Sequence, residues 1–80
     1  MAYVEIALAP NPKPIWKGEL ALPDNDPQSA LDAVFAIFNE RHPVSYGSNR
    51  SLSVGDEVFL ATPQLAATFR CTSHGWESVN

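Results

Sequence analysis

The sequence predicts an α+β domain in which one helix packs on a small, mostly antiparallel sheet. Residues 27–40 carry apolar side chains at helical spacing, and five other short segments alternate apolar and polar residues as half-buried strands do. The helical segment follows the second of these strands, so the expected order is β-β-α-β-β-β. With 80 residues the chain has room for one such domain, residues 1–80.

The first two strands flank a proline-rich stretch. Residues 3–8 alternate and place three aliphatic side chains on one face: Val4, Ile6 and Leu8. Prolines at positions 10, 12 and 14 end this strand, because proline has no N–H to donate to a neighbouring strand. Residues 15–22 alternate again and place three apolar side chains on one face: Trp16, Leu20 and Leu22. We therefore expect an antiparallel pair.

The helix is expected to begin at Pro27. Asp26 can accept hydrogen bonds from the first N–H groups of the helix, and proline suits the first helical position. The face expected to lie on the sheet has four large apolar residues: Leu31, Val34, Phe35 and Phe38. His42 precedes Pro43, and a residue before proline is disfavoured in the helical region, so the helix should end there.

The last third of the chain predicts three short strands, at residues 54–60, 67–72 and 76–79. The first begins at a turn at Gly55-Asp56, which we interpret as structural because it sets the register of the strand. The second places Phe69 and Cys71 inward, and a tight turn ending at Gly75 leads to the third.

Charge and composition exclude several classes of protein. The formal net charge is −4 at pH 7, whereas a general nucleic-acid binder is normally basic because it neutralises phosphates. Cys71 is the only cysteine, so an intrachain disulfide framework is excluded. No apolar run approaches the roughly 20 residues that span a bilayer, and the N-terminus lacks a signal-peptide pattern. We therefore expect a cytoplasmic protein that does not bind a membrane.

Cys71 and His74 are the residues to test for catalysis. Their spacing suits a thiol with a neighbouring base, but no motif supplies an Asn or Asp to orient the imidazole. A zinc site would have to combine these two with His42, without the paired ligands that structural zinc sites use. We expect no enzymatic activity, no metal and no cofactor.

Residues 41–50 form the most distinctive polar segment. Four of its side chains suit contact with a partner: Arg41, His42, Tyr46 and Arg50. Arginine and tyrosine are frequent at the centres of protein interfaces, and they also stack on nucleic-acid bases. Three interpretations stay open for this segment: a solvated connection, a protein contact and a nucleic-acid contact.

Two motifs in the second half of the chain resemble a known family. RSLSVGDEV at residues 50–58 and GWESV at residues 75–79 look like the small SLSVGDVV…GW proteins of bacterial phages, plasmids and integrative elements, similar to YodL-like domains. The helix and its His42-Pro43 boundary extend the resemblance to residues 28–80. Glu57 replaces the family's common valine, and the connection at residues 62–67 is longer. The resemblance implies a mobile-element accessory protein without a known active site.

These observations predict a non-enzymatic accessory or interaction protein of a phage or mobile element that acts by binding another protein. The alternative is a nucleic-acid-associated accessory factor that uses residues 41–50. A chain near the lower size limit for a self-sufficient core also favours self-association. We expect a homodimer through the outer sheet face or through an edge that the first two strands leave open, and the first strand, whose only charge is Glu5, is weakly protected against such pairing.

Overall fold

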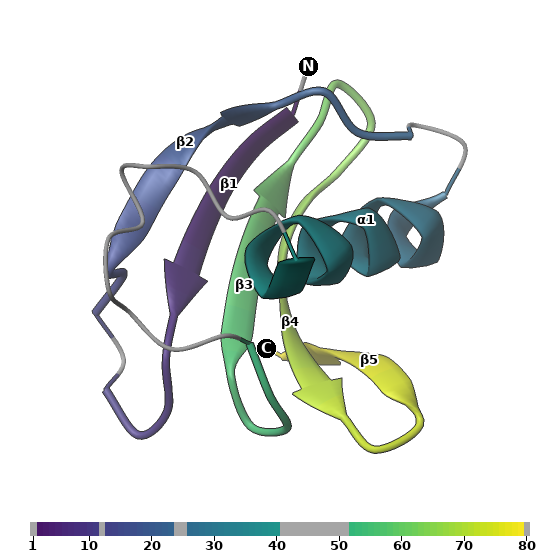
Figure 1. The fold of residues 1–80 in the computed structure, drawn as a ribbon. Helices are drawn as coiled ribbons and strands as arrows, with labels where there is room; N and C mark the ends of the chain where they lie inside the picture. The colour runs from purple at the N-terminus through teal and green to yellow at the C-terminus, as the bar shows by residue number, and fades with distance from the viewer. Residues whose placement is uncertain (1, 12, 24–25, 41–51, 80) are drawn as a thin grey trace.

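The computed structural model describes residues 2–11, 13–23, 26–40 and 52–79 and confirms the predicted α+β class and element order. The elements are, in chain order, β1 (Ala2–Ala7), β2 (Trp16–Leu20), α1 (Pro27–Glu40), β3 (Glu57–Ala61), β4 (Ala66–Thr72) and β5 (Gly75–Val79). The five strands form one antiparallel sheet, and α1 crosses one of its faces (Figure 1).

The order of strands across the sheet is β2-β1-β3-β4-β5. The predicted antiparallel pair of β1 and β2 is confirmed, with Ile6 opposite Trp16 and Ala2 opposite Leu20. On its other side β1 pairs with β3, so β1 is an inner strand. Of the first two strands, which were expected to leave an edge open, β1 has none, because β3 pairs with its other side, whereas β2 lies at one edge of the sheet and β5 at the other.

The core lies between the sheet and α1. Because side chains alternate along a strand, every second residue of β1 and β3 faces the helix. These side chains pack against the apolar face of α1. Seven large side chains at this contact have no exposed surface: Val4, Ile6, Leu31, Val34, Phe38, Val58 and Leu60. Each such burial contributes about 1.5–3 kcal/mol to the free energy of unfolding. This small set is the main source of stability.

The position of Phe35 differs from the prediction. Leu31, Val34 and Phe38 are fully buried as expected, but Phe35 is only half-buried. Its ring instead meets the edge strand, where it packs edge-on against Trp76 with ring centroids 6.4 Å apart. The apolar arc of the helix is wider than its contact with the sheet, so Phe35 lies at the flank of the core.

Trp16 covers the core at the other edge of the sheet, in β2. Its ring lies against Phe38, with centroids 4.9 Å apart and an interplanar angle of 67°. It also lies over Gly18, where a Cβ would come within 2.6 Å of the indole. A glycine is therefore required at position 18 by the close approach of the ring.

Asp26 caps α1 as predicted. The backbone N–H of Ser29 donates to Asp26 Oδ1 at 2.8 Å, and the Ser29 hydroxyl donates to Oδ2 at 3.1 Å. These hydrogen bonds lower the pKa of the Asp26 carboxyl below its ordinary value of 3.8, the backbone N–H having the largest effect. The cap fixes where the helix begins, and hence where Phe35 meets the sheet edge.

α1 covers one face of the sheet, and the face opposite it carries charged side chains. There Arg70 lies between two glutamates, 3.2 Å from Glu57 and 3.5 Å from Glu77. Tyr3 donates its hydroxyl proton to Glu5 at 2.7 Å, and this hydrogen bond raises the pKa of Tyr3. Within the described ranges, no helix is long and apolar enough to cross a membrane.

Candidate functional site

The four residues predicted to contact a partner, Arg41, His42, Tyr46 and Arg50, lie outside the described residues. Their proposed role therefore stays a prediction. The described residues do locate the other candidates, namely the Cys71–His74 pair, the turn before β3 and a surface groove.

Cys71 is a buried residue of β4 whose side chain points inward, as predicted. Burial, and to a smaller extent the negative charge of Asp56, raises the pKa of the thiol. A raised pKa keeps the thiol protonated at neutral pH, whereas a catalytic cysteine needs surroundings that favour the thiolate. The environment of Cys71 is the opposite of what a nucleophile requires.

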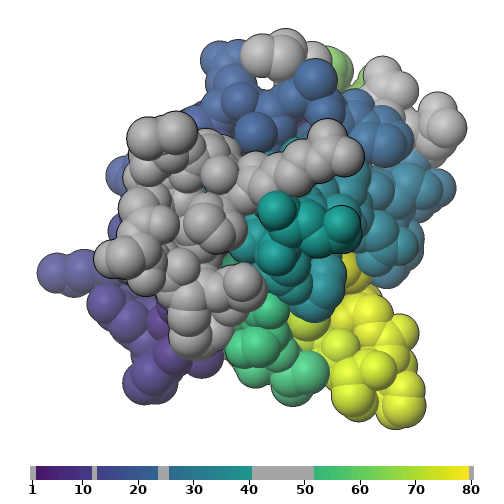
Figure 2. All heavy atoms as spheres, viewed as in Figure 1, coloured from purple at the N-terminus to yellow at the C-terminus, as the bar shows by residue number. Residues whose placement is uncertain are grey.

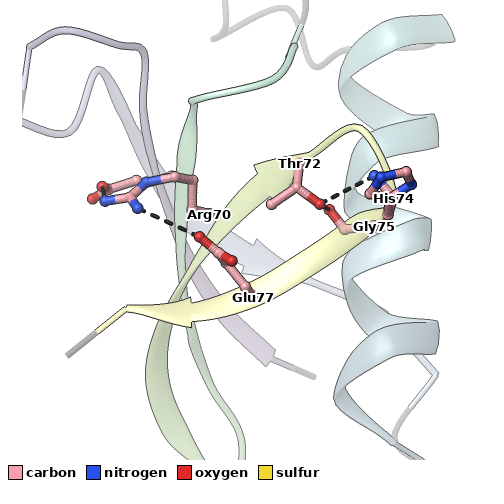
Figure 3. Close-up of polar contacts among 6 residues, drawn as sticks. Arg70, Thr72, His74, Gly75 and Glu77 are labelled. Atoms are coloured by element: carbon pink, nitrogen blue, oxygen red, sulfur yellow. Dashed lines mark hydrogen bonds and ion pairs between the residues drawn. The ribbon is translucent and has the colours of Figure 1, made fainter.

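His74 lies in the exposed turn between β4 and β5. Its backbone N–H donates to the Thr72 hydroxyl oxygen at 3.1 Å, and that hydroxyl donates to the Gly75 carbonyl at 3.0 Å (Figure 3). The arrangement confirms the predicted tight turn and gives His74 a backbone role in it. Among the described residues, no three His, Cys, Asp or Glu side chains are grouped as metal ligands would be.

The turn before β3 is built around a buried carboxylate. The Asp56 N–H donates to the Ser53 carbonyl at 3.1 Å, and Gly55 has φ +97°, the left-handed value that the third residue of a type II turn needs. Asp56 has no exposed surface and accepts N–H groups from Ala9 and Ser53, both at 2.8 Å. Two backbone bonds, Gly55 N–H to Cys71 O and Cys71 N–H to Asp56 O, both 2.9 Å, join the turn to β4.

The same turn exposes Val54. This side chain is 64% exposed, and it is the one large hydrophobic side chain with most of its surface in solvent among the residues that the structure describes. The hydrogen bonds of the buried Asp56 hold the turn in place, and Val54, in the same turn, points into solvent. An isolated exposed valine needs no explanation, but this one borders a groove.

A groove of about 440 Å³ lies between α1 and the β4–β5 hairpin, on the helix-covered side of the sheet. Its three walls come from separate parts of the chain: Asp32 and Phe35 of α1, residues 52–54 of the turn segment, and the hairpin with Cys71 and Trp76. Figure 2 shows this face, where the helix and the C-terminal strands meet. The volume is in the range of about 300–1,000 Å³ that ligand sites occupy.

Side-chain hydrogen bonds fix both ends of the groove. At one end Asn39 holds Leu52, accepting its N–H at 2.7 Å and donating Nδ2–H to its carbonyl at 3.3 Å. At the other end Gln28 donates Nε2–H to the Trp76 carbonyl at 3.3 Å. Because both bonds run from α1 to another wall, the walls of the groove are pre-set at their present spacing.

The residues of the groove were not predicted as a site. Phe35 was expected in the core, on the face of the helix that lies on the sheet. Trp76 is half-buried and packs against the edge of the core. Alternation and helical spacing identify which residues are apolar, but they do not show that three separate segments converge. The only sequence signal was a valine, Val54, at a turn position where polar residues are usual.

No family model matches the chain, and searches of curated proteins and of solved structures find no match.

Proposed function

We propose that this domain is a non-enzymatic binding module that holds an apolar segment of another protein in the groove between α1 and the β4–β5 hairpin. The observation that carries the proposal is the convergence of Phe35, Trp76 and the exposed Val54 on one pre-set hollow. Aromatic and aliphatic side chains around a concave surface are the usual anchor sites of protein interfaces.

The charges around the groove favour a cationic partner segment. Asp32 lies at its rim, and α1 contains no lysine or arginine. The described basic residues lie elsewhere: Lys13 in the β1–β2 connection, Lys17 in β2, and Arg70 between two glutamates. A segment with an apolar anchor and a nearby lysine or arginine complements this arrangement.

The same charges support protein over nucleic acid as the partner. The described residues include eight of the nine acidic residues and three of the five basic ones. Asp56 is buried, but the other seven described acidic side chains reach the surface and would repel a phosphate backbone. The alternative, a nucleic-acid-associated factor acting through Arg41, Tyr46 and Arg50, predicts binding of DNA or RNA that weakens steeply as salt is raised.

The proposed role in a phage or mobile element rests on the resemblance of residues 50–58 and 75–79 to YodL-like proteins. An accessory protein of this kind acts in the cytoplasm by occupying a partner rather than by catalysis. The raised pKa of the Cys71 thiol supports a non-enzymatic role.

A photo-crosslinking amino acid at position 54 tests the proposal. The full chain carrying it is irradiated in cells of the source organism, and the captured protein is identified, purified and titrated against the unmodified domain. We expect a discrete adduct from position 54 and none from position 66, an exposed alanine of β4.

The affinity for the purified partner should then fall at least about tenfold in Val54→Asp. The substitution removes an apolar contact and places a carboxylate where it would have to lose its water. The matched variant Ala66→Asp should bind as the unmodified chain does. Equal binding by both variants would refute the groove as the binding site.

A further inference from the structure

The edge strand β2 has a sequence that is complementary to itself in the antiparallel direction. Its five residues are Trp16, Lys17, Gly18, Glu19 and Leu20, with Gly18 at the centre. When two copies of this strand run antiparallel about a two-fold axis at Gly18, Lys17 faces Glu19 of the other copy, twice. In the same register Trp16 faces Leu20 of the other copy, also twice. Apart from the central glycine, every pair along the strand is then either oppositely charged or apolar.

The faces of the sheet agree with this register. Trp16 and Gly18 pair with the inward-facing residues Ile6 and Val4, so Trp16 and Leu20 lie on the helix-covered face. Lys17 and Glu19 lie on the opposite face and are exposed. A two-fold axis perpendicular to the sheet keeps each face on its own side. The apolar pairs therefore extend the core side, and the ionic pairs lie in solvent.

We propose that two copies of this chain associate through β2, joining their sheets edge to edge in the register centred on Gly18. The occupant of the β2 edge is thus a second copy of the same chain. β2 is an edge strand in the described sheet, and an edge strand can take up a further strand through backbone hydrogen bonds. A two-fold contact needs one surface that complements itself, which this strand provides.

The other edge, β5, lacks these properties. The register that pairs the whole of β5 with its own copy centres on Glu77 and sets that carboxylate against itself. The Trp76 carbonyl already accepts a hydrogen bond from Gln28 of α1. Like charges directly opposite one another in neighbouring strands are destabilising.

Stacking of two copies through the open sheet face is also disfavoured. That face carries Lys17 and Arg70 as its described basic residues, against four acidic ones: Glu5, Glu19, Glu57 and Glu77. Face-to-face association would bring two net negative surfaces together. Among these three routes, the β2 edge is the one that pairs opposite charges.

A charge-exchange experiment on the full chain tests this interface. Sedimentation velocity over a concentration series should show the unmodified chain passing from monomer to dimer. Lys17→Glu sets glutamate against glutamate at both ionic pairs of the interface, and Glu19→Lys sets lysine against lysine. Each single variant should therefore raise the dimer dissociation constant at least about tenfold.

Two restorations, with the urea stability of each variant measured alongside, separate a lost contact from a damaged fold, since Lys17 also lies opposite Glu5 of β1 in its own chain. The double variant Lys17→Glu/Glu19→Lys should dimerise as the unmodified chain does, because its pairs are again of opposite sign. An equimolar mixture of the two single variants should form a heterodimer, because each glutamate of one chain then faces a lysine of the other. A control at the other edge, Glu77→Lys, should leave dimerisation unchanged.

The inference is overturned if the unmodified chain stays monomeric at high micromolar concentration, or if both single variants dimerise normally. Failure of the mixture to associate would also overturn it. None of these outcomes bears on the groove, since β2 contributes no residue to its walls and Trp76 lies in β5, at the other edge of the sheet.

Discussion

Asn39 binds both backbone groups of Leu52, a residue thirteen positions later in the chain. The amide accepts the Leu52 N–H at 2.7 Å and donates to the Leu52 carbonyl at 3.3 Å, as a neighbouring strand would. Leu52 itself is buried in the core. Asn39 therefore couples the end of α1 to the segment that leads into β3 and forms one wall of the groove.

Replacing Asn39 by alanine leaves the two Leu52 groups without these partners. We expect Asn39→Ala to lower the free energy of unfolding by about 1–3 kcal/mol, because polar groups near a buried residue lose their hydrogen bonds. Urea denaturation monitored by circular dichroism measures the change. The exposed residue Gln64 serves as control, since Gln64→Ala should alter stability by less than about 0.5 kcal/mol. Equal stability of the two variants would show that the Leu52 contact is not coupled to folding.

The carboxylate of Asp56 is expected to be essential for the turn before β3. In Asp56→Asn, one oxygen becomes an NH₂ group, which cannot accept the N–H of Ala9 or Ser53. We expect a loss of about 2–3 kcal/mol, since the displaced donor is part-buried and its bond was to a charged group. Thermal or urea unfolding tests it. Glu40→Gln, which removes an exposed charge, should be nearly neutral, and a stable Asp56→Asn would contradict the role assigned to the carboxylate.

Stability of the helix cap should depend on pH in one direction. The Ser29 N–H and hydroxyl lower the pKa of Asp26 in the folded state below 3.8, so the folded protein binds this proton less readily than the unfolded chain. The cap's contribution to the free energy of unfolding is complete above pH 3.8, and it is lost as the pH falls through the lowered pKa of Asp26. The asparagine of the Asp26→Asn variant also caps but does not titrate. We expect the stability advantage of the unmodified chain over this variant to shrink between neutral pH and pH below 3.8; a constant difference would show that the cap is not the cause.

Gly55 is required by its backbone conformation rather than by lack of space. A Cβ at this position would lie 3.7 Å from the Ala9 Cβ, an ordinary contact, but φ is +97°. We expect Gly55→Val to cost at least about 1–2 kcal/mol, because a β-branched residue strongly disfavours positive φ. Gly55→Asn should cost less, since asparagine visits this region more readily. If Gly55→Val keeps its stability in urea but loses partner binding, the turn is itself a contact surface and the structural interpretation is wrong.

Local patterns in the sequence were sufficient for the elements and their faces. Asp26, Pro27 and the apolar spacing located α1, and alternation located the inward residues of β1 and β4. Both kinds of signal act within a few residues, where the periods of helix and strand are fixed by backbone geometry. For that reason the element order was predictable without knowledge of tertiary contacts.

The strand order and the groove depend on contacts that local patterns do not encode. Alternation says which face a residue occupies, but not that β3 would take the open side of β1. Phe35 has the same helical spacing as its buried neighbours, yet its place is decided by Trp76, far along the chain. The groove could not be predicted because its three walls meet only in the folded state. The segment that was predicted as the contact, residues 41–50, lies outside the described residues.

The pairing of β1 with β3 has a consequence for the kinetics of folding. The sheet divides into a hairpin of β1 and β2 and a meander of β3, β4 and β5, each closed by short connections, and the two parts meet along one ladder. At one end of that ladder Ala7 pairs with Glu57, fifty positions later. Closing so long a loop costs entropy before its contacts are gained, so we expect this step to limit the rate of folding. Truncation of Ile6 should then slow refolding in stopped-flow measurements, whereas truncation of Val79 in β5 should mainly accelerate unfolding.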